Sequence, residues 1–136
     1  MKRWNLSLIL ACAIALASVL VMAQDPITVG PDIYKKLFEN ERIRVIEVTF
    51  KPGAKMGLHS HPDHFVYALT EGKLIISKPD GTSQVVEGKP GLYFWIGAES
   101  HQAENIGTTE FKLLVTELKE PAPKPTKSAE AKPAGK

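Results

Sequence analysis

The sequence has only one cysteine, Cys12, among its 136 residues. Cys12 falls in an N-terminal apolar segment that we expect to be removed, so the remaining chain would contain no thiol. This absence excludes disulfides, cysteine-based zinc sites and a cysteine nucleophile from the mature protein. An oxidising compartment is compatible with such a chain, because no thiol is left to oxidise.

Residues 24–120 also lack an excess of basic side chains. This stretch contains 11 Lys and Arg against 14 Asp and Glu, which gives a formal charge of −3. A slightly acidic segment without a basic stripe argues against nucleic acid as a partner. The stretch has no internal repeat, and its length fits one domain with one hydrophobic core.

The first 23 residues have the pattern of a secretory signal peptide. Lys2 and Arg3 precede an apolar run over 6–22, and Ala23 provides a small residue for cleavage. A retained anchor or a buried helix is the weaker alternative, because the run is short for a membrane span. Lipoprotein processing at Cys12 ranks lower still, since it would leave a very short apolar region before the cut. We therefore predict a signal peptide over 1–23, a periplasmic or secreted protein, and no transmembrane span in the mature form.

The other end of the chain, residues 121–136, is composed mainly of Pro, Ala and Lys. It has no large apolar residue, so it cannot bury enough surface to offset the entropy of ordering, and we predict a disordered tail. Its four Lys and one Glu fit a solubilising tail. A weak tether to an anionic envelope surface is the alternative.

Between the two ends, residues 24–120 are expected to form a single all-β domain. Short runs rich in Val, Ile, Thr, Tyr and Phe alternate with turn residues, which is typical of a sandwich or barrel. In the run 42–50 one alternating set of residues is mostly apolar, and we expect this set, Arg44, Ile46, Val48 and Phe50, to form the core face. The segment 33–39 fits either a short helix or a strand that pairs with 42–50, and the strand is favoured.

Gly-containing turns separate the other expected strands. We expect a turn at 51–53, a hairpin through 70–72 that pairs 64–69 with 73–77, and a hairpin through 78–81 with its return strand at 84–87. A further turn is expected at 89–91. The remaining expected strands are 92–96, 102–105 and 111–118.

The chain has four histidines, and three of them fall within six residues. His59 and His61 are two positions apart, so on a strand their side chains point to the same face. Two imidazoles on one face can fill two positions around a metal ion, at nitrogen distances of about 2.0–2.1 Å. His101 is the one distant histidine, and we predict it as the third ligand.

Two glycine- and histidine-containing segments resemble the two conserved motifs of the cupin superfamily, of the small single-domain kind. In the first, Gly53 is followed by five residues, then His59 and His61, and Gly72 falls at the family's spacing. In the second, five residues separate Gly91 from Gly97, and His101 and Asn105 follow. The resemblance covers about residues 40–118. It implies one antiparallel jelly-roll β-barrel, a metal site, a small-molecule ligand or substrate and, by analogy, a homodimer.

The motifs depart from the family pattern at a few positions. Phe65 stands where the family has a glutamate ligand, which leaves three family ligands rather than four. His64 is a candidate for the missing ligand. Strand parity from His61 would turn it outward, whereas a turn at Pro62-Asp63 would bring it inward, so both placements stay open.

Several other side chains are assigned at this stage. Phe65, Tyr67 and Trp95 are expected to line the barrel near the site, although each also fits a packing role. Glu47, Glu99 and Glu104 are expected to be surface charges. We find no general base outside the histidines.

The ligand set does not choose between Fe, Zn, Ni, Cu and Mn as the one divalent metal. The favoured hypothesis is a metal-dependent enzyme acting on a small molecule. Iron would suit dioxygenase-like chemistry, and zinc or nickel would suit Lewis-acid chemistry. A non-catalytic envelope module that binds a metal or a small ligand is the main alternative, and a barrel that has lost its metal is a third.

Overall fold

The computed structural model describes residues 24–119, so the expected signal peptide (1–23) and tail (121–136) lie outside the described residues. The described part contains one short helix and nine strands, as the sequence predicted for an all-β domain. In chain order they are α1 (Pro26–Val29), β1 (Tyr34–Glu39), β2 (Ile43–Phe50), β3 (Lys55–His61), β4 (His64–Ala68), β5 (Gly72–Ser77), β6 (Ser83–Gly88), β7 (Tyr93–Ile96), β8 (Glu99–Asn105) and β9 (Phe111–Leu118). Within residues 24–119, no helix is long and apolar enough to cross a membrane.

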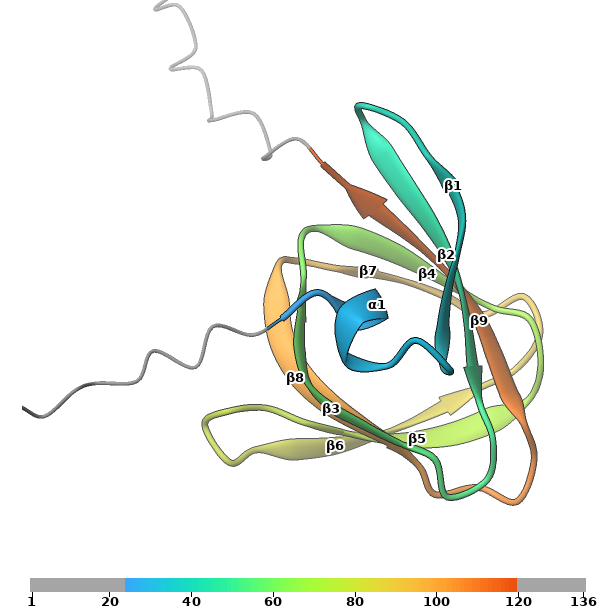
Figure 1. Ribbon diagram of the computed structural model, residues 1–136. Coiled ribbons are helices and arrows are strands. Elements are labelled where there is room, and N and C mark those ends of the chain that lie inside the picture. The colour runs from blue at the N-terminus through green and yellow to red at the C-terminus, as the bar shows by residue number, and fades with distance from the viewer. Residues whose placement is uncertain (1–23, 120–136) are drawn as a thin grey trace, which may run out of the picture.

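The strands form two antiparallel sheets that wrap around a common interior (Figure 1). The five-stranded sheet has the order β1-β2-β9-β4-β7, and the four-stranded sheet has the order β3-β8-β5-β6. Strands that follow each other in sequence often lie in different sheets, as in a jelly roll. The predicted antiparallel jelly-roll barrel is therefore confirmed.

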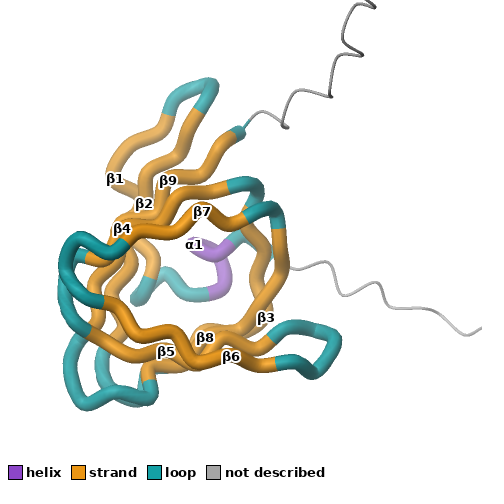
Figure 2. The backbone as a smooth tube through the Cα atoms, turned by 180° about the vertical axis from the view of Figure 1, so that it is seen from behind, coloured by secondary structure: helices purple, strands orange, loops and turns teal. Residues whose placement is uncertain are grey.

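The edge strands of the two sheets differ in what lies against them. α1 packs against β1 and β3, which are one edge of each sheet. Figure 2, the view from the opposite side, shows α1 through the ring of strands. Asp25 caps α1 by accepting a hydrogen bond from the backbone N–H of Ile27 over 3.0 Å. The other two edges are β6 and β7.

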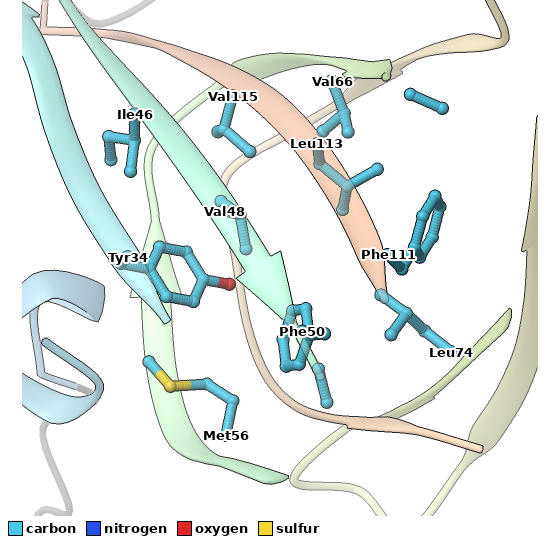
Figure 3. Close-up of a cluster of buried hydrophobic side chains, with 12 residues drawn as sticks. Tyr34, Ile46, Val48, Phe50, Met56, Val66, Leu74, Phe111, Leu113 and Val115 are labelled. Atoms are coloured by element: carbon cyan, nitrogen blue, oxygen red, sulfur yellow. The ribbon is translucent and has the colours of Figure 1, made fainter. Parts of the chain in front are cut away.

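The core follows from the alternation of β2 and β9, which are neighbours in one sheet. Every second residue of β9 from Phe111 onward is buried, and Ile46, Val48 and Phe50 of β2 are buried beside them. Figure 3 shows the labelled side chains of these two strands on the same side of the sheet. The predicted core face of 42–50 is confirmed for Ile46, Val48 and Phe50, whereas Arg44 is only partly buried. The pairing of β1 with β2 confirms the prediction of a strand over 33–39.

Three of the predicted turns form. Ala54 donates its N–H to the carbonyl of Lys51 over 2.9 Å, and Gly81 donates to Lys78 over 3.0 Å in the β5–β6 hairpin. Gly81 has φ +86° and Gly91 has φ +88°, a region that side-chain-bearing residues rarely adopt.

The predicted hairpin through residues 70–72 is wrong. β4 pairs with β7 and β9 in one sheet, whereas β5 pairs with β6 and β8 in the other. Turn residues show that the chain reverses but do not show which sheet it enters next, and here the segment crosses between sheets. Gly72 is instead required by packing, because a Cβ at this position would overlap Cγ of Phe111.

Candidate metal centre

His59 and His61 lie on β3 and point into the barrel. Both side chains are buried, with exposed fractions of 0% and 5%. β3 pairs with β8 in a register that sets His59 opposite His101. This pairing brings the distant histidine to the other two, which places together the three residues that the sequence singled out.

The three imidazoles are close enough to share one ion. Their ring centroids lie 4.9 Å apart for His59 and His61, 4.5 Å for His59 and His101, and 5.4 Å for His61 and His101. Each ring offers a nitrogen within 4.8 Å of the nitrogens offered by the others. A buried set of three neutral nitrogen donors fits a divalent transition metal.

All four histidines use the same ring nitrogen for a local hydrogen bond. Because each partner of Nδ1 is an oxygen acceptor, Nδ1 carries a proton, and in the neutral ring Nε2 then keeps its lone pair. The Nδ1 partners are the carbonyl of Gly57 for His59 (2.8 Å), the carboxylate of Glu117 for His61 (2.6 Å), the carbonyl of Pro62 for His64 (2.8 Å) and the carboxylate of Glu99 for His101 (2.9 Å).

His64 lies inside the barrel, beside the three. Its side chain is 2% exposed, and its ring centroid is 4.7 Å from that of His61. Parity does not carry over from β3 because Pro62 and Asp63 take the chain from one sheet to the other. Asp63 holds this link by accepting a hydrogen bond from the N–H of Ala98 over 2.8 Å. His64 is outside the group of three whose ligand atoms all lie within 4.8 Å of one another, so its role as a ligand stays a prediction.

Burial also keeps the rings in the form that binds a metal. It lowers the pKa of His59 to about 4, with the carbonyl of Gly57 opposing the shift. Burial likewise lowers the pKa of His64 and of His101. At neutral pH these imidazoles are therefore uncharged, as metal ligation requires.

Glu117 is a site residue that the sequence analysis missed. It is 1% exposed and points inward from β9, where its carboxylate accepts from His61 and from Nε of Arg44, both over 2.6 Å. Arg44 also pairs with Asp25, next to α1. Burial opposes ionisation of Glu117, but the hydrogen bonds from His61 and Arg44 lower the pKa of its carboxyl below the usual value. A signal was present: Glu117 follows Phe111, Leu113 and Val115 in one alternating series.

Glu99 is not the simple surface charge that we expected. Its side chain is 21% exposed, and it bonds both His101 and Nζ of Lys78, which lies 3.0 Å away. Burial opposes ionisation, yet Lys78 and His101 lower the pKa of the Glu99 carboxyl. Its parity explains the placement, because Glu99 and His101 are two residues apart on β8 and face the same way.

Tyr34 is the second residue that the sequence did not identify. Its hydroxyl lies 3.2 Å from Nε2 of His59, and it must be the donor because Nδ1 holds the proton of that ring. Burial, with the nearby charge of Glu117, raises the pKa of the Tyr34 hydroxyl. The phenol thus stays protonated and remains a donor next to the site.

A cavity of about 410 Å³ adjoins the histidines, and His61, His64 and His101 are part of its wall. Of the three aromatic residues expected to line it, only Trp95 borders the cavity, at its exposed rim, where it is 59% exposed and lies opposite Phe65 of β4. Phe65 and Tyr67 lie on the outer face of the sheet instead, where Phe65 stacks on Tyr93 with centroids 5.7 Å apart. The strand β4 alternates from His64, so these two positions point away from the interior.

Comparisons with known proteins agree with this architecture. No protein-family model matches the chain. The beta-alanine degradation protein BauB of Pseudomonas aeruginosa is 32% identical over 82 residues, which cover 60% of this chain and 86% of BauB. A cupin domain from Bordetella pertussis Tohama I is 31% identical with a TM-score of 0.60, and the match covers 65% of this chain and 93% of that domain. An RmlC-like cupin family protein with a double-stranded β-helix fold from Methanocaldococcus jannaschii is similar in fold alone, at 15% identity and a TM-score of 0.53, over 63% of this chain and 78% of that one.

Proposed function

This chain belongs to the cupin superfamily, and we propose that it binds one divalent transition-metal ion and acts on a small molecule held in the adjoining cavity. The ligands would be the Nε2 atoms of His59, His61 and His101. The observation that carries the proposal is the shared orientation of these rings. In each ring Nδ1 donates a hydrogen bond to an oxygen, which leaves the lone pair of Nε2 for a metal. Three such nitrogens within 4.8 Å of one another form a preorganised donor set.

Bound iron would supply oxygen-dependent chemistry, whereas zinc or nickel would supply Lewis-acid chemistry. The chain's own residues would orient and insulate the site. Glu117 and Glu99 hold two of the rings in one tautomer by accepting from Nδ1. Tyr34 keeps a protonated hydroxyl beside His59, where it would donate to an oxygen of a bound molecule.

The alternative is a non-catalytic module that binds a metal or a small ligand. The observation in its favour is that both carboxylates near the histidines are already engaged, Glu99 with Lys78 and Glu117 with Arg44. A carboxylate held in an ion pair is a poor general base.

One comparison favours the enzyme over the binding module. The relative BauB is named for degradation of beta-alanine, and this supports small-molecule metabolism over storage of metal.

Metal content after loading and dialysis tests the site. We expect one equivalent of metal in the parent protein and a loss of at least tenfold in affinity for His59→Ala, His61→Ala and His101→Ala. Gln102→Ala is the matched control, because Gln102 is exposed and adjoins His101 on β8. Equal metal content in all four variants would contradict the proposal.

Turnover then separates the enzyme from the binding module. The iron-loaded protein would be tested for substrate-dependent oxygen uptake, and the zinc- and nickel-loaded forms for hydrolysis or isomerisation of a small-molecule panel. Activity that is lost in His101→Ala and kept in Gln102→Ala supports the enzyme. Tight metal binding without turnover in any form supports the binding module.

We also propose that the protein forms a homodimer through the outer face of the five-stranded sheet. Exposed aromatic residues lie there on the neighbouring strands β4 and β7: Tyr67 (39% exposed), Tyr93 (64%) and Trp95 (59%). Exposed aromatic clusters of this kind commonly mark interaction surfaces. Light scattering should give twice the mass of one chain, and Trp95→Lys should give monomers, whereas Val85→Lys on the other sheet should not.

We further propose export of the protein, guided by residues 1–23. The support is the sequence pattern alone: basic residues, an apolar run and a small residue before Gln24. Expression of the full chain in a bacterial host followed by N-terminal sequencing tests it. A mature N-terminus at Gln24 in the periplasmic fraction is expected, and an uncleaved chain in the cytoplasm would contradict it.

A further inference from the structure

The cavity beside the histidines has walls that are mostly apolar. Aliphatic and aromatic side chains from both sheets form these walls, and five of the six named here appear in Figure 3. They are Val48, Phe50, Val66, Leu74, Val86 and Phe111. A volume of about 410 Å³ falls in the lower range of small-molecule sites. Walls of this kind favour a ligand with an apolar body, since each buried CH₂ group contributes roughly fourfold in affinity.

The cavity opens between β6 and β7, the free edges of the two sheets. The exposed residues of its wall all lie at this opening: Lys78 and Gln84 on the β5–β6 side, and Trp95 and Gly97 on the β7 side. The opposite pair of edges, β1 and β3, is covered by α1. A ligand would therefore enter past Lys78 and Trp95 and meet the histidines and the apolar wall inside.

The charges around the cavity do not balance a bound metal. Of the side chains that line the cavity in the described part of the chain, only Lys78 and Glu99 are charged, and they pair with each other over 3.0 Å. Behind the rings, Glu117 pairs with Arg44, and Arg44 pairs with Asp25. These five groups together carry one net negative charge. A divalent ion on three neutral imidazoles would thus keep at least one positive charge uncompensated beside a mostly apolar cavity, where an unbalanced charge is costly.

We propose that the ligand of this cavity is an organic monoanion, with a carboxylate or a similar oxygen anion at one end and an uncharged aliphatic or aromatic body. The anionic end would neutralise the metal site, and the body would lie against the apolar wall. A second charge on the body is disfavoured, because none of the wall residues within 24–119 offers an unpaired charge to receive it. This inference rests on the proposed metal site and adds the chemical class of the molecule.

Binding of four matched probes to the cobalt-loaded protein tests the inference. Metal content is measured first, and then hexanoate, acetate, 1-hexanol and 6-aminohexanoate are titrated by calorimetry and by the change in the cobalt absorption spectrum. We expect hexanoate to bind at least tenfold more tightly than each of the others. Acetate has the carboxylate but lacks the apolar body, and 1-hexanol has the apolar body but lacks the negative charge. 6-Aminohexanoate has both but carries a second, positive charge at the far end of the body.

A pair of neighbouring valines on β6 gives a matched control. Val86 lines the cavity, whereas Val85 is 53% exposed on the outer face. Val86→Asp should weaken hexanoate binding at least tenfold without a loss of metal, and Val85→Asp should change it less than twofold. If Val86→Asp does not fold, the probe series on the parent protein decides alone.

The failures of the two proposals are distinguishable. A protein that binds no cobalt would overturn the metal site and this inference together. A protein that binds cobalt but takes acetate, 1-hexanol or 6-aminohexanoate as tightly as hexanoate would overturn this inference only. No change in the cobalt spectrum with any probe at millimolar concentration would do the same.

Discussion

The carboxylate of Glu117 accepts a hydrogen bond from Nδ1 of His61 over 2.6 Å, and this contact joins β9 of one sheet to β3 of the other. The second oxygen of Glu117 accepts from Nε of Arg44 over 2.6 Å. Glu117 therefore fixes the ring of His61 from behind and is itself held by a cation. Such partners of a metal-binding histidine set its tautomer and its orientation.

Glu117→Gln should weaken metal binding by about 10–100-fold, because a neutral amide accepts from His61 less strongly and turns its NH₂ group toward Arg44. The variant should also lose stability, since Arg44, whose side chain is 17% exposed, would lose one of its carboxylate partners and keep Asp25. Competition with a chelator measures the affinity. Glu47→Gln on the outer face of β2 is the control, and equal affinities for both variants would contradict the role of Glu117.

Tyr34→Phe should tighten metal binding by roughly 2–10-fold. The Tyr34 hydroxyl donates to the lone pair of His59 that the metal would use, so the metal competes with a hydrogen bond worth about 0.5–1.5 kcal/mol. The metal-free variant should be less stable by a similar amount, because Nε2 of His59 loses its donor. Metal titration and urea unfolding measure the two effects. Tyr93→Phe, on the exposed outer face, should change neither, and weaker metal binding in Tyr34→Phe would contradict this account.

The variant His64→Ala tests whether His64 is a fourth metal ligand or only lies beside the other three histidines. Because His64 lies outside the group of three closely spaced nitrogens, we expect its loss to lower metal affinity less than tenfold. His61→Ala should lower it by far more, since it removes a member of that group. Both affinities come from the same chelator competition. Equal losses in the two variants would make His64 a ligand and require it to move toward the other three on binding.

Much of the fold could be predicted from the sequence because the signals are local. The alternation in 42–50 identified Ile46, Val48 and Phe50 as core residues, and the glycine-containing turns at 78–81 and 89–91 fell where the chain reverses. The pairing partner of β4 could not be predicted in this way. The turn at 70–72 reads as a hairpin, yet the chain there passes from one sheet to the other.

In the candidate metal site, too, the residues close together in sequence could be predicted, whereas most of those brought together only by strand pairing could not. The alternate spacing of His59 and His61 predicted a shared face, and His101 was predicted as the third ligand because it is the one distant histidine; the structure places it with them. Glu117 and Tyr34 lie far from the histidines in sequence, so only the register of strands brings them close. His64 could not be placed, because its direction depends on how the link at Pro62 changes sheets.

The stability of the metal-free protein should fall as the pH falls from about 6.5 toward 4. Burial lowers the pKa of His59 from 6.5 to about 4 in the folded state, so within this window the unfolded chain binds more protons than the folded one. The contribution of His59 to the free energy of unfolding is fully present above pH 6.5, and it is lost as the pH falls toward the pKa of His59 in the folded protein, about 4. For this residue alone the loss amounts to roughly 3 kcal/mol.

Urea unfolding at pH 7.5 and pH 4.5 in the presence of a chelator measures the effect of His59. The lowered pKa values of His64 and His101 act in the same direction. His59→Gln removes one titrating ring and should flatten the dependence in part. A free energy of unfolding that stays constant or rises on acidification would contradict the buried neutral state of these rings.

Gly88→Ala should destabilise the fold by about 1–3 kcal/mol. Gly88 and Gly72 face each other on β6 and β5, and a Cβ on either one would fall inside the van der Waals envelope of the buried Phe111 ring. The ring is 1% exposed and has little room to move aside. Gly57→Ala is the matched control, because a Cβ there meets only Val29 Cγ1 at an ordinary 3.4 Å, and it should change the free energy of unfolding by less than 1 kcal/mol.

Phe111→Leu combined with Gly88→Ala should cost less than the sum of the two single changes, since the smaller side chain leaves space for the new methyl group. Additive losses in urea unfolding, or a Gly88→Ala variant as stable as the parent, would show that the ring is not what requires a glycine at this position.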